Sequence, residues 1–251
     1  MGWSPSKISR IETAQTPIAE GDLQRLLDLY EASDSRRDQL TELRRNVQQR
    51  IWLDAYGDTL RPEAATFMEL EADADLVRWY APAVVPGLLQ TEEYAREIVS
   101  STLLLASPSR IERRVEVRVT SQRVLARDEP PQIAVVLDEA VVRRPVGGRG
   151  VMQGQLRHLL DLSERPDITL RVLPFGAGSH PAMTGGFTIF RLPAPVTAEV
   201  VYLEHMTSDV FVESDADIRY YNLAFERLSS LALDDDESQS FIADAAGISE
   251  H

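Results

Sequence analysis

Five hydroxyl and cationic side chains stand close together near the amino terminus, where their types are suited to contact a polyanion. The stretch 4–12, SPSKISRIE, begins with a serine and a proline, an order that favours a helix start, and we expect a helix to about residue 12. Ile8 and Ile11 share one face of it, so the polar side chains point largely outward. Hydroxyls, lysine and arginine donate hydrogen bonds to phosphates and base edges. The candidate DNA-contacting residues are Ser4, Ser6, Lys7, Ser9 and Arg10.

A second set of candidates lies near the ends of predicted strands, before a predicted helix or in the glycine-rich loop 174–186, PFGAGSHPAMTGG. A long loop between strands is suited to cover a pocket as a lid. Thr91 opens a predicted helix, either as an ordinary N-cap, which we favour, or as part of an anion site. The candidate ligand-pocket residues are Trp79, Tyr80, Gln90, Glu139, His180 and Glu204.

Catalysis would have to use carboxylates and histidines. The pairs 138–139 (Asp-Glu) and 204–205 (Glu-His) would meet at one sheet edge as a general acid/base set, although neighbours on a strand face opposite ways. We favour solvated or ion-paired carboxylates near Arg143 and Arg144, and we expect no enzyme and no catalytic residues. The chain has no cysteine and no histidine pair at helical zinc spacing, so we expect no metal and no cofactor.

Composition limits the partners and the compartment. The formal net charge is −14, which repels phosphate backbones, so any nucleic-acid contact must come from a local patch. No apolar run approaches the roughly 18 residues that span a bilayer, and the amino terminus lacks the pattern of a secretory signal. We therefore expect a cytoplasmic protein with no membrane partner. Lys7 is the only lysine among many arginines, a codon bias typical of a GC-rich bacterial genome.

A nearly neutral head and an acidic body predict two domains, 1–46 and 47–251. The first is a short all-α remnant with a helix around Leu23 and Leu27, and a longer helix from about residue 35 to 56 joins it to the second. The second mixes helices with strands, which predicts an α+β fold with a mixed sheet. Its segment 107–131 fits a strand or a helix, and its length favours a helix. The other expected helices are 63–75, 91–104, 151–166, 214–233 and 235–246, and the expected strands are 76–82, 132–142, 168–175, 185–193 and 199–206.

The first residues carry a resemblance. GWSPSKISRIETAQTP resembles the recognition-helix half of the XRE-type helix-turn-helix, whose pattern is close to W-S-x-S-K-x-S-R-I-E-x-G, and DLQRLLDLYEASDSRRDQLTELRR resembles its last helices. The motifs VVPGLLQTEEYAR, VVLDEAVVRRPVGG, VLPFGAGSHPAM and VVYLEH resemble the uncharacterised domain that follows such modules in a large bacterial regulator family. The resemblance implies a DNA-binding transcriptional regulator with an effector- or partner-binding carboxy-terminal domain. Specific binding through a few base contacts of about 1–3 kcal/mol each requires two half-sites, hence a homodimer.

Two departures from the family pattern bear on DNA binding. The module normally begins some residues earlier, so its amino-terminal part is missing here, and Ala14 stands where a glycine usually closes the recognition helix. We expect DNA binding to be incomplete or lost in this chain, through a late start codon, a true truncation or a redeployed domain. The alternative function is a protein-interaction module, or a small-molecule-binding or enzymatic domain, that no longer binds DNA. A small acidic partner protein would need an arginine patch, for which the candidates are Arg110, Arg113, Arg114, Arg118, Arg123 and Arg127.

Overall fold

The computed structural model describes residues 18–30, 32–33, 36–37, 40–41, 61–194 and 198–248. The chain divides into two compact units, Met1–Gly57 and Asp58–His251, whereas the sequence places the boundary after residue 46. The predicted recognition helix and most of the predicted helix 35–56 lie outside the described residues. In the described part, no helix is both long and apolar enough to cross a membrane.

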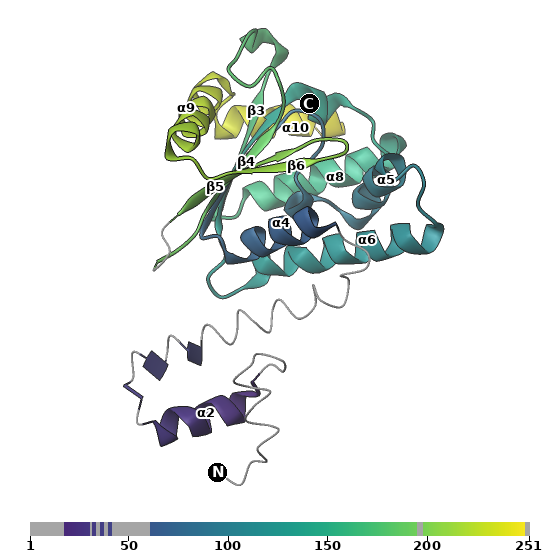
Figure 1. The fold of residues 1–251 in the computed structure, drawn as a ribbon. Helices are drawn as coiled ribbons and strands as arrows, with labels where there is room; N and C mark the ends of the chain where they lie inside the picture. Colours follow the sequence, from purple (N-terminus) through teal and green to yellow (C-terminus); the bar gives the residue numbers. More distant parts are fainter. Residues whose placement is uncertain are drawn as a thin grey trace. The chain divides into compact units, whose positions relative to one another are not determined.

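The first unit is described mainly by the helix α2, Glu20–Leu29, drawn in purple in Figure 1. Leu23 and Leu27, one turn apart, are its buried residues. Beyond the helix, Arg37 donates from Nε to the carbonyl of Ala32 (3.0 Å) and from Nη2 to the carbonyl of Leu27 (3.1 Å). Its Nη1 also pairs with Asp28 at 2.8 Å. The arginine thus satisfies a carbonyl of the last helical turn, which has no partner within the helix.

The second unit is built on a six-stranded sheet, in the order β3-β2-β1-β4-β5-β6. β1, β2 and β3 run parallel, and β4, β5 and β6 pair antiparallel, so the predicted mixed sheet and the α+β class are confirmed. Parallel neighbours need long crossovers, which here carry helices, while the antiparallel strands follow one another through short turns. The strands are Leu76–Ala81 (β1), Gln132–Asp138 (β2), Ile168–Leu173 (β3), Phe187–Arg191 (β4), Glu199–Glu204 (β5) and Asp209–Val212 (β6).

Helices cover both faces of this sheet. The helix α9 packs against β1, β3 and β5, and α8 and α10 pack together and against β3 on the other face (Figure 1). The α-helices of the unit are Pro62–Asp73 (α4), Glu92–Thr102 (α5), Pro108–Ser121 (α6), Glu139–Arg143 (α7), Gly148–Ser163 (α8), Asp215–Leu231 (α9) and Asp235–Ala246 (α10). The short 3-10 turns are Gly87–Leu89 (η1), Gln122–Ala126 (η2) and Phe175–Ala177 (η3).

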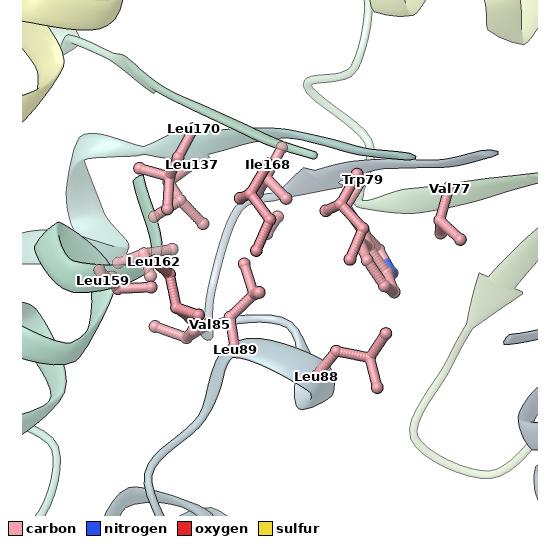
Figure 2. Close-up of a cluster of buried hydrophobic side chains, with 14 of the residues drawn as sticks. Val77, Trp79, Val85, Leu88, Leu89, Leu137, Leu159, Leu162, Ile168 and Leu170 are labelled. Atoms are coloured by element: carbon pink, nitrogen blue, oxygen red, sulfur yellow. The ribbon is translucent and has the colours of Figure 1, made fainter. Parts of the chain in front are cut away.

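Alternation along the strands separates two apolar cores. On β1, Val77 and Trp79 face the larger core with Leu88 and Leu159, which Figure 2 shows beneath the sheet. Tyr80, between Trp79 and Ala81, faces the smaller core beneath α9. This follows from the strand period of two, which sends neighbouring side chains to opposite faces.

The structure corrects one predicted strand and decides one open choice. The strand expected over 132–142 ends at Asp138, whose Oδ1 accepts from the N–H of Ala140 at 2.8 Å and so caps the start of α7. The ambiguous segment 107–131 forms a helix over most of its length, as favoured: Ser107 caps α6 with Pro108 at its first position, and η2 continues it to Ala126. The strand β6 was not predicted, because four residues are too few for a clear alternation.

Candidate functional site at the carboxyl edge of the sheet

One loop crosses the carboxyl ends of the parallel strands. The register pairs Ala81 with Leu137 and Asp138 with Leu173, so β1, β2 and β3 end at the same edge. Phe187, which opens β4, pairs with Tyr80 at this edge. The loop 174–186, drawn in green at the top of Figure 1, therefore passes from β3 to β4 across the ends of β2 and β1. Ligands of open α/β sheets bind at such carboxyl ends.

Tyr80 and His180 connect the strand to this loop. The Tyr80 hydroxyl lies 3.3 Å from His180 Nε2, and the two rings meet edge to face with centroids 5.4 Å apart. Burial raises the pKa of Tyr80 well above its usual value, and the charge and hydrogen bond of Asp138 raise it further. The phenol therefore stays protonated beside the Asp138 carboxylate.

The backbone fixes which nitrogen of His180 holds the proton. The N–H of Ala182 donates to His180 Nδ1 at 3.3 Å, so a neutral ring carries its hydrogen on Nε2. That hydrogen is donated to the Tyr80 oxygen. The contact between the loop and β1 thus has a direction that is set by the Ala182 amide, and the Asp138 carboxylate at the end of β2 acts on the same phenol.

Glu139 ties down the start of the same loop. Its Oε2 accepts from the N–H of Phe175 at 2.7 Å, and its Oε1 accepts from Arg143 Nε one helical turn away. Desolvation opposes the charged form of Glu139, but these two hydrogen bonds together with the Arg143 charge hold its pKa below the usual range. The loop is thus attached at both Phe175 and His180.

We predict that the substitution His180→Ala loosens the loop without unfolding the domain. Loss of one neutral hydrogen bond is worth about 1 kcal/mol, so amides of residues 175–182 should exchange with solvent about fivefold to tenfold faster. Hydrogen exchange followed by mass spectrometry measures this rate. His205→Ala removes an exposed histidine from the β5–β6 turn and serves as the control. Equal exchange of the loop in both variants would contradict the assigned contact.

The family assignment rests on the carboxy-terminal unit. A family model described as a domain of unknown function, DUF5753, matches residues 64–244. The chain belongs to the DUF5753 family. A second model, described as a helix-turn-helix domain, matches residues 1–40, which points to a DNA-binding, regulator-like protein. Among curated proteins and among solved structures, no match to the chain was found.

The DUF5753 domain brings together two of the six predicted pocket residues, Tyr80 and His180, with Glu139 at the other attachment of the loop. Trp79 lies in the larger core on the opposite face of β1 (Figure 2). Gln90 is buried and donates to the carbonyl of Val85 at 2.8 Å. The candidate DNA contacts Ser4, Ser6, Lys7, Ser9 and Arg10 lie outside the described residues.

The PGLLQT motif of the DUF5753 domain is a buried turn held by amide side chains. Gln155 of α8, which is fully buried, donates to the carbonyl of Leu89 and accepts from the N–H of Thr91, both at 2.7 Å. Gln122 donates to the carbonyls of Gly87 (3.0 Å) and Gln90 (2.7 Å). Thr91 caps α5 by accepting from the N–H of Tyr94, as favoured from the sequence. The roles of Gln155 and Gln122 were not predicted, because an isolated glutamine has no local sequence signal.

The two acidic pairs end at the same sheet edge but not at one point. Asp138 closes β2 and Glu204 closes β5, and β1 and β4 lie between these strands. At about 4.8 Å per strand, the separation is roughly 14 Å, too far for both carboxylates to reach one reacting atom. Glu204 and His205 are exposed. In the described ranges, no group of three or more histidine, aspartate or glutamate side chains is arranged to hold a metal ion.

The arginine-rich segment of the DUF5753 domain does not form one patch. Arg113 lines a groove of about 360 Å³ between α5 and α6, where Arg96 bridges Glu92 and Glu112. Arg127 donates to the carbonyl of Ala72 at 2.6 Å, at the end of α4. The remaining arginines of α6 share another face of the helix, and the charge of Arg61, which precedes α4, acts on Arg114 among them.

Proposed function

We propose that this chain is a transcriptional regulator of the XRE type, whose helix-turn-helix domain binds DNA and whose DUF5753 domain responds to an effector. One observation carries the proposal: the helix-turn-helix match over residues 1–40 is joined, in one chain, to a separate α+β unit that matches DUF5753. A helix-turn-helix places its recognition helix in the major groove. A unit with its own core is able to bind a ligand independently of DNA.

On the DNA side, the recognition helix is the stretch 4–12. Lys7 and Arg10 supply phosphate or guanine contacts, and Ser4, Ser6 and Ser9 supply shorter hydroxyl contacts. A homodimer presents two such helices to two half-sites, which gives the affinity that one helix lacks.

On the effector side, the carboxyl edge is the site that a small ligand is expected to occupy. Its polar groups are engaged with one another: Tyr80 with His180 and Asp138, and Glu139 with the backbone of Phe175. A ligand that brings its own donors and acceptors replaces these contacts and displaces the loop 174–186. A protein partner is the second candidate, favoured by Leu104 and Leu105, which are 86% and 102% exposed at the α5–α6 turn.

The DNA-binding claim is tested by selecting duplexes from a random pool with the full chain. We expect an enriched sequence, and we expect Lys7→Ala combined with Arg10→Ala to weaken its binding by about 100-fold, since base contacts contribute about 1–3 kcal/mol each. Arg219→Ala combined with Arg227→Ala removes the same charge from exposed positions of α9 and serves as the control.

Two results would contradict the proposal. One is a pool from which the full chain enriches no sequence. The other is an equal loss of affinity in the recognition-helix variant and the α9 variant, because that loss would reflect net charge alone.

A further inference from the structure

Four arginines come together beside α4 and α6. Arg110, Arg114 and Arg118 follow each other at intervals of four residues on α6, so they share one helix face. The charge of Arg61, the residue before α4, acts on the middle arginine: burial lowers the pKa of Arg114, and the charges of Arg110, Arg61 and Arg118 lower it further. We call Arg61, Arg110, Arg114 and Arg118 the arginine row.

The arginine row has few carboxylate partners in an acidic protein. Arg61 pairs with Asp209 at 2.9 Å, but within the described residues no ion pair involves the other three arginines of the row. Elsewhere in the domain, arginines such as Arg165 and Arg171 do find carboxylates, at 2.8 and 2.7 Å. Exposed arginines such as Arg219 and Arg227 also lack an ion pair in the described part of the chain, but Arg114 is partly buried, and the charges that act on it come from other arginines.

Unsatisfied polar atoms gather at the same place. In the described ranges, the buried side-chain atoms without a hydrogen-bond partner are Glu71 Oε1, Arg114 Nε and Asp209 Oδ1. Glu71 is 3% exposed and lies beside Arg118, and Asp209 is the partner of Arg61. Buried polar atoms are nearly always paired in native proteins, and an ion, water or ligand usually completes the exceptions. Each of the three atoms thus belongs to the arginine row or to a residue that interacts with it, which indicates that the hydrogen bonding around the row is incomplete.

The backbone holds one arginine of the row in place. A Cβ on Gly87 would lie 1.9 Å from Arg118 Nη1 and 2.9 Å from its Cδ, so the side chain of Arg118 lies directly against the η1 turn. Only a glycine allows this approach. The packing against η1 limits where the guanidinium can lie, which reduces the entropy lost on binding.

We propose that the arginine row binds a phosphate-bearing ligand. Phosphate fits because it carries up to two charges and several acceptor oxygens, which several planar guanidinium forks are able to share. The phosphate belongs either to a small phosphorylated molecule or to the backbone of DNA. The site uses none of the residues of the loop 174–186 and neither Lys7 nor Arg10, and it does not depend on the proposed function.

The first test is a titration of the full chain with inorganic pyrophosphate at constant ionic strength. We expect the melting temperature of the DUF5753 domain to rise by about 5 °C at one hundred times Kd. Arg114→Gln combined with Arg118→Gln should weaken binding, followed by calorimetry, about 10- to 100-fold. Arg219→Gln combined with Arg227→Gln should leave binding unchanged. Circular dichroism of the row variant without ligand checks that it stays folded, because Arg118 also stabilises the charged form of the buried Glu71.

A second variant displaces a charge without removing it. Gly87→Ala should push the Arg118 guanidinium away from the η1 turn and weaken pyrophosphate binding about tenfold, with the net charge unchanged. Unchanged affinity in this variant, together with equal affinity in the row and α9 variants, would overturn the proposal.

A binding experiment with DNA identifies the source of the phosphate. The affinity of the full chain for a 30-base-pair duplex is measured over a series of salt concentrations. If the row contacts the backbone, its double variant should reduce the slope of log K against log salt by about 2. Pyrophosphate binding with an unchanged slope assigns the site to a small phosphorylated ligand. If the full chain does not bind pyrophosphate and the slope does not change, the site is refuted, even where the recognition helix itself binds DNA.

Discussion

Replacing Gln155 with leucine should lower the free energy of unfolding of the DUF5753 domain by about 3–5 kcal/mol. The side chain is fully buried, and both of its ends bond to backbone groups of the PGLLQT turn, the carbonyl of Leu89 and the N–H of Thr91. Leucine fills a similar volume but leaves both groups buried and unpaired, at about 1–3 kcal/mol each. Chemical denaturation followed by circular dichroism measures the change.

Gln153 of the same helix provides a matched control. It is only half-buried and makes one hydrogen bond, to the carbonyl of Ala246 at 3.1 Å. The substitution Gln153→Leu should therefore cost less than about 1 kcal/mol. Similar losses in the two variants would mean that the glutamine contacts do not hold the turn.

Replacing Glu71 with glutamine should stabilise the domain at pH 8 by as much as about 3 kcal/mol and have little effect at pH 4.5. Burial raises the pKa of Glu71 from 4.5 to about 7, against the opposing effects of Arg118 and Ser121. The folded state therefore retains a proton that the unfolded state has already released. Stability is full below pH 4.5, falls between pH 4.5 and 7, and stays reduced above pH 7, and glutamine removes this fall.

Denaturation curves at pH 4.5, 6 and 8 measure this dependence. Glu69→Gln alters an exposed carboxyl of the same helix, α4, and should leave the pH profile unchanged. If the Glu71 variant and the parent protein differ by the same amount at every pH, the carboxyl does not titrate between 4.5 and 7 in the folded protein.

Much of the second unit could be predicted from sequence, because its elements carry local signals. The strand Leu76–Ala81 and the helices Pro62–Asp73 and Asp235–Ala246 follow the predicted ranges closely, since strand and helix periods are read over short windows. The strand predicted over 132–142 is wrong beyond Asp138. The apolar residues that follow continue the pattern of a strand, but Asp138 caps a helix that begins at the next residue.

Contacts between residues that are far apart in the sequence could not be predicted from it. The glycine-rich loop was expected to act as a lid, but the residue that it contacts was not predicted. Tyr80 and His180 are 100 residues apart in the sequence, and only the order of the strands brings them together. The six arginines of residues 110–127 were the candidates for one patch. In the fold, Arg113 and Arg114 have different neighbours. Glu71, Asp209 and Gln155 had no signal at all, because their roles depend on partners in other elements.

The regulator proposal depends most directly on sequence-specific DNA binding. The decisive measurement is the affinity of the full chain for its enriched duplex against a shuffled duplex of the same composition, both at about 150 mM salt. We predict a specificity ratio of about 1,000 or more, as is typical of specific DNA-binding proteins. A ratio near 1 would contradict the account, since it would show that the helix-turn-helix segment reads no sequence.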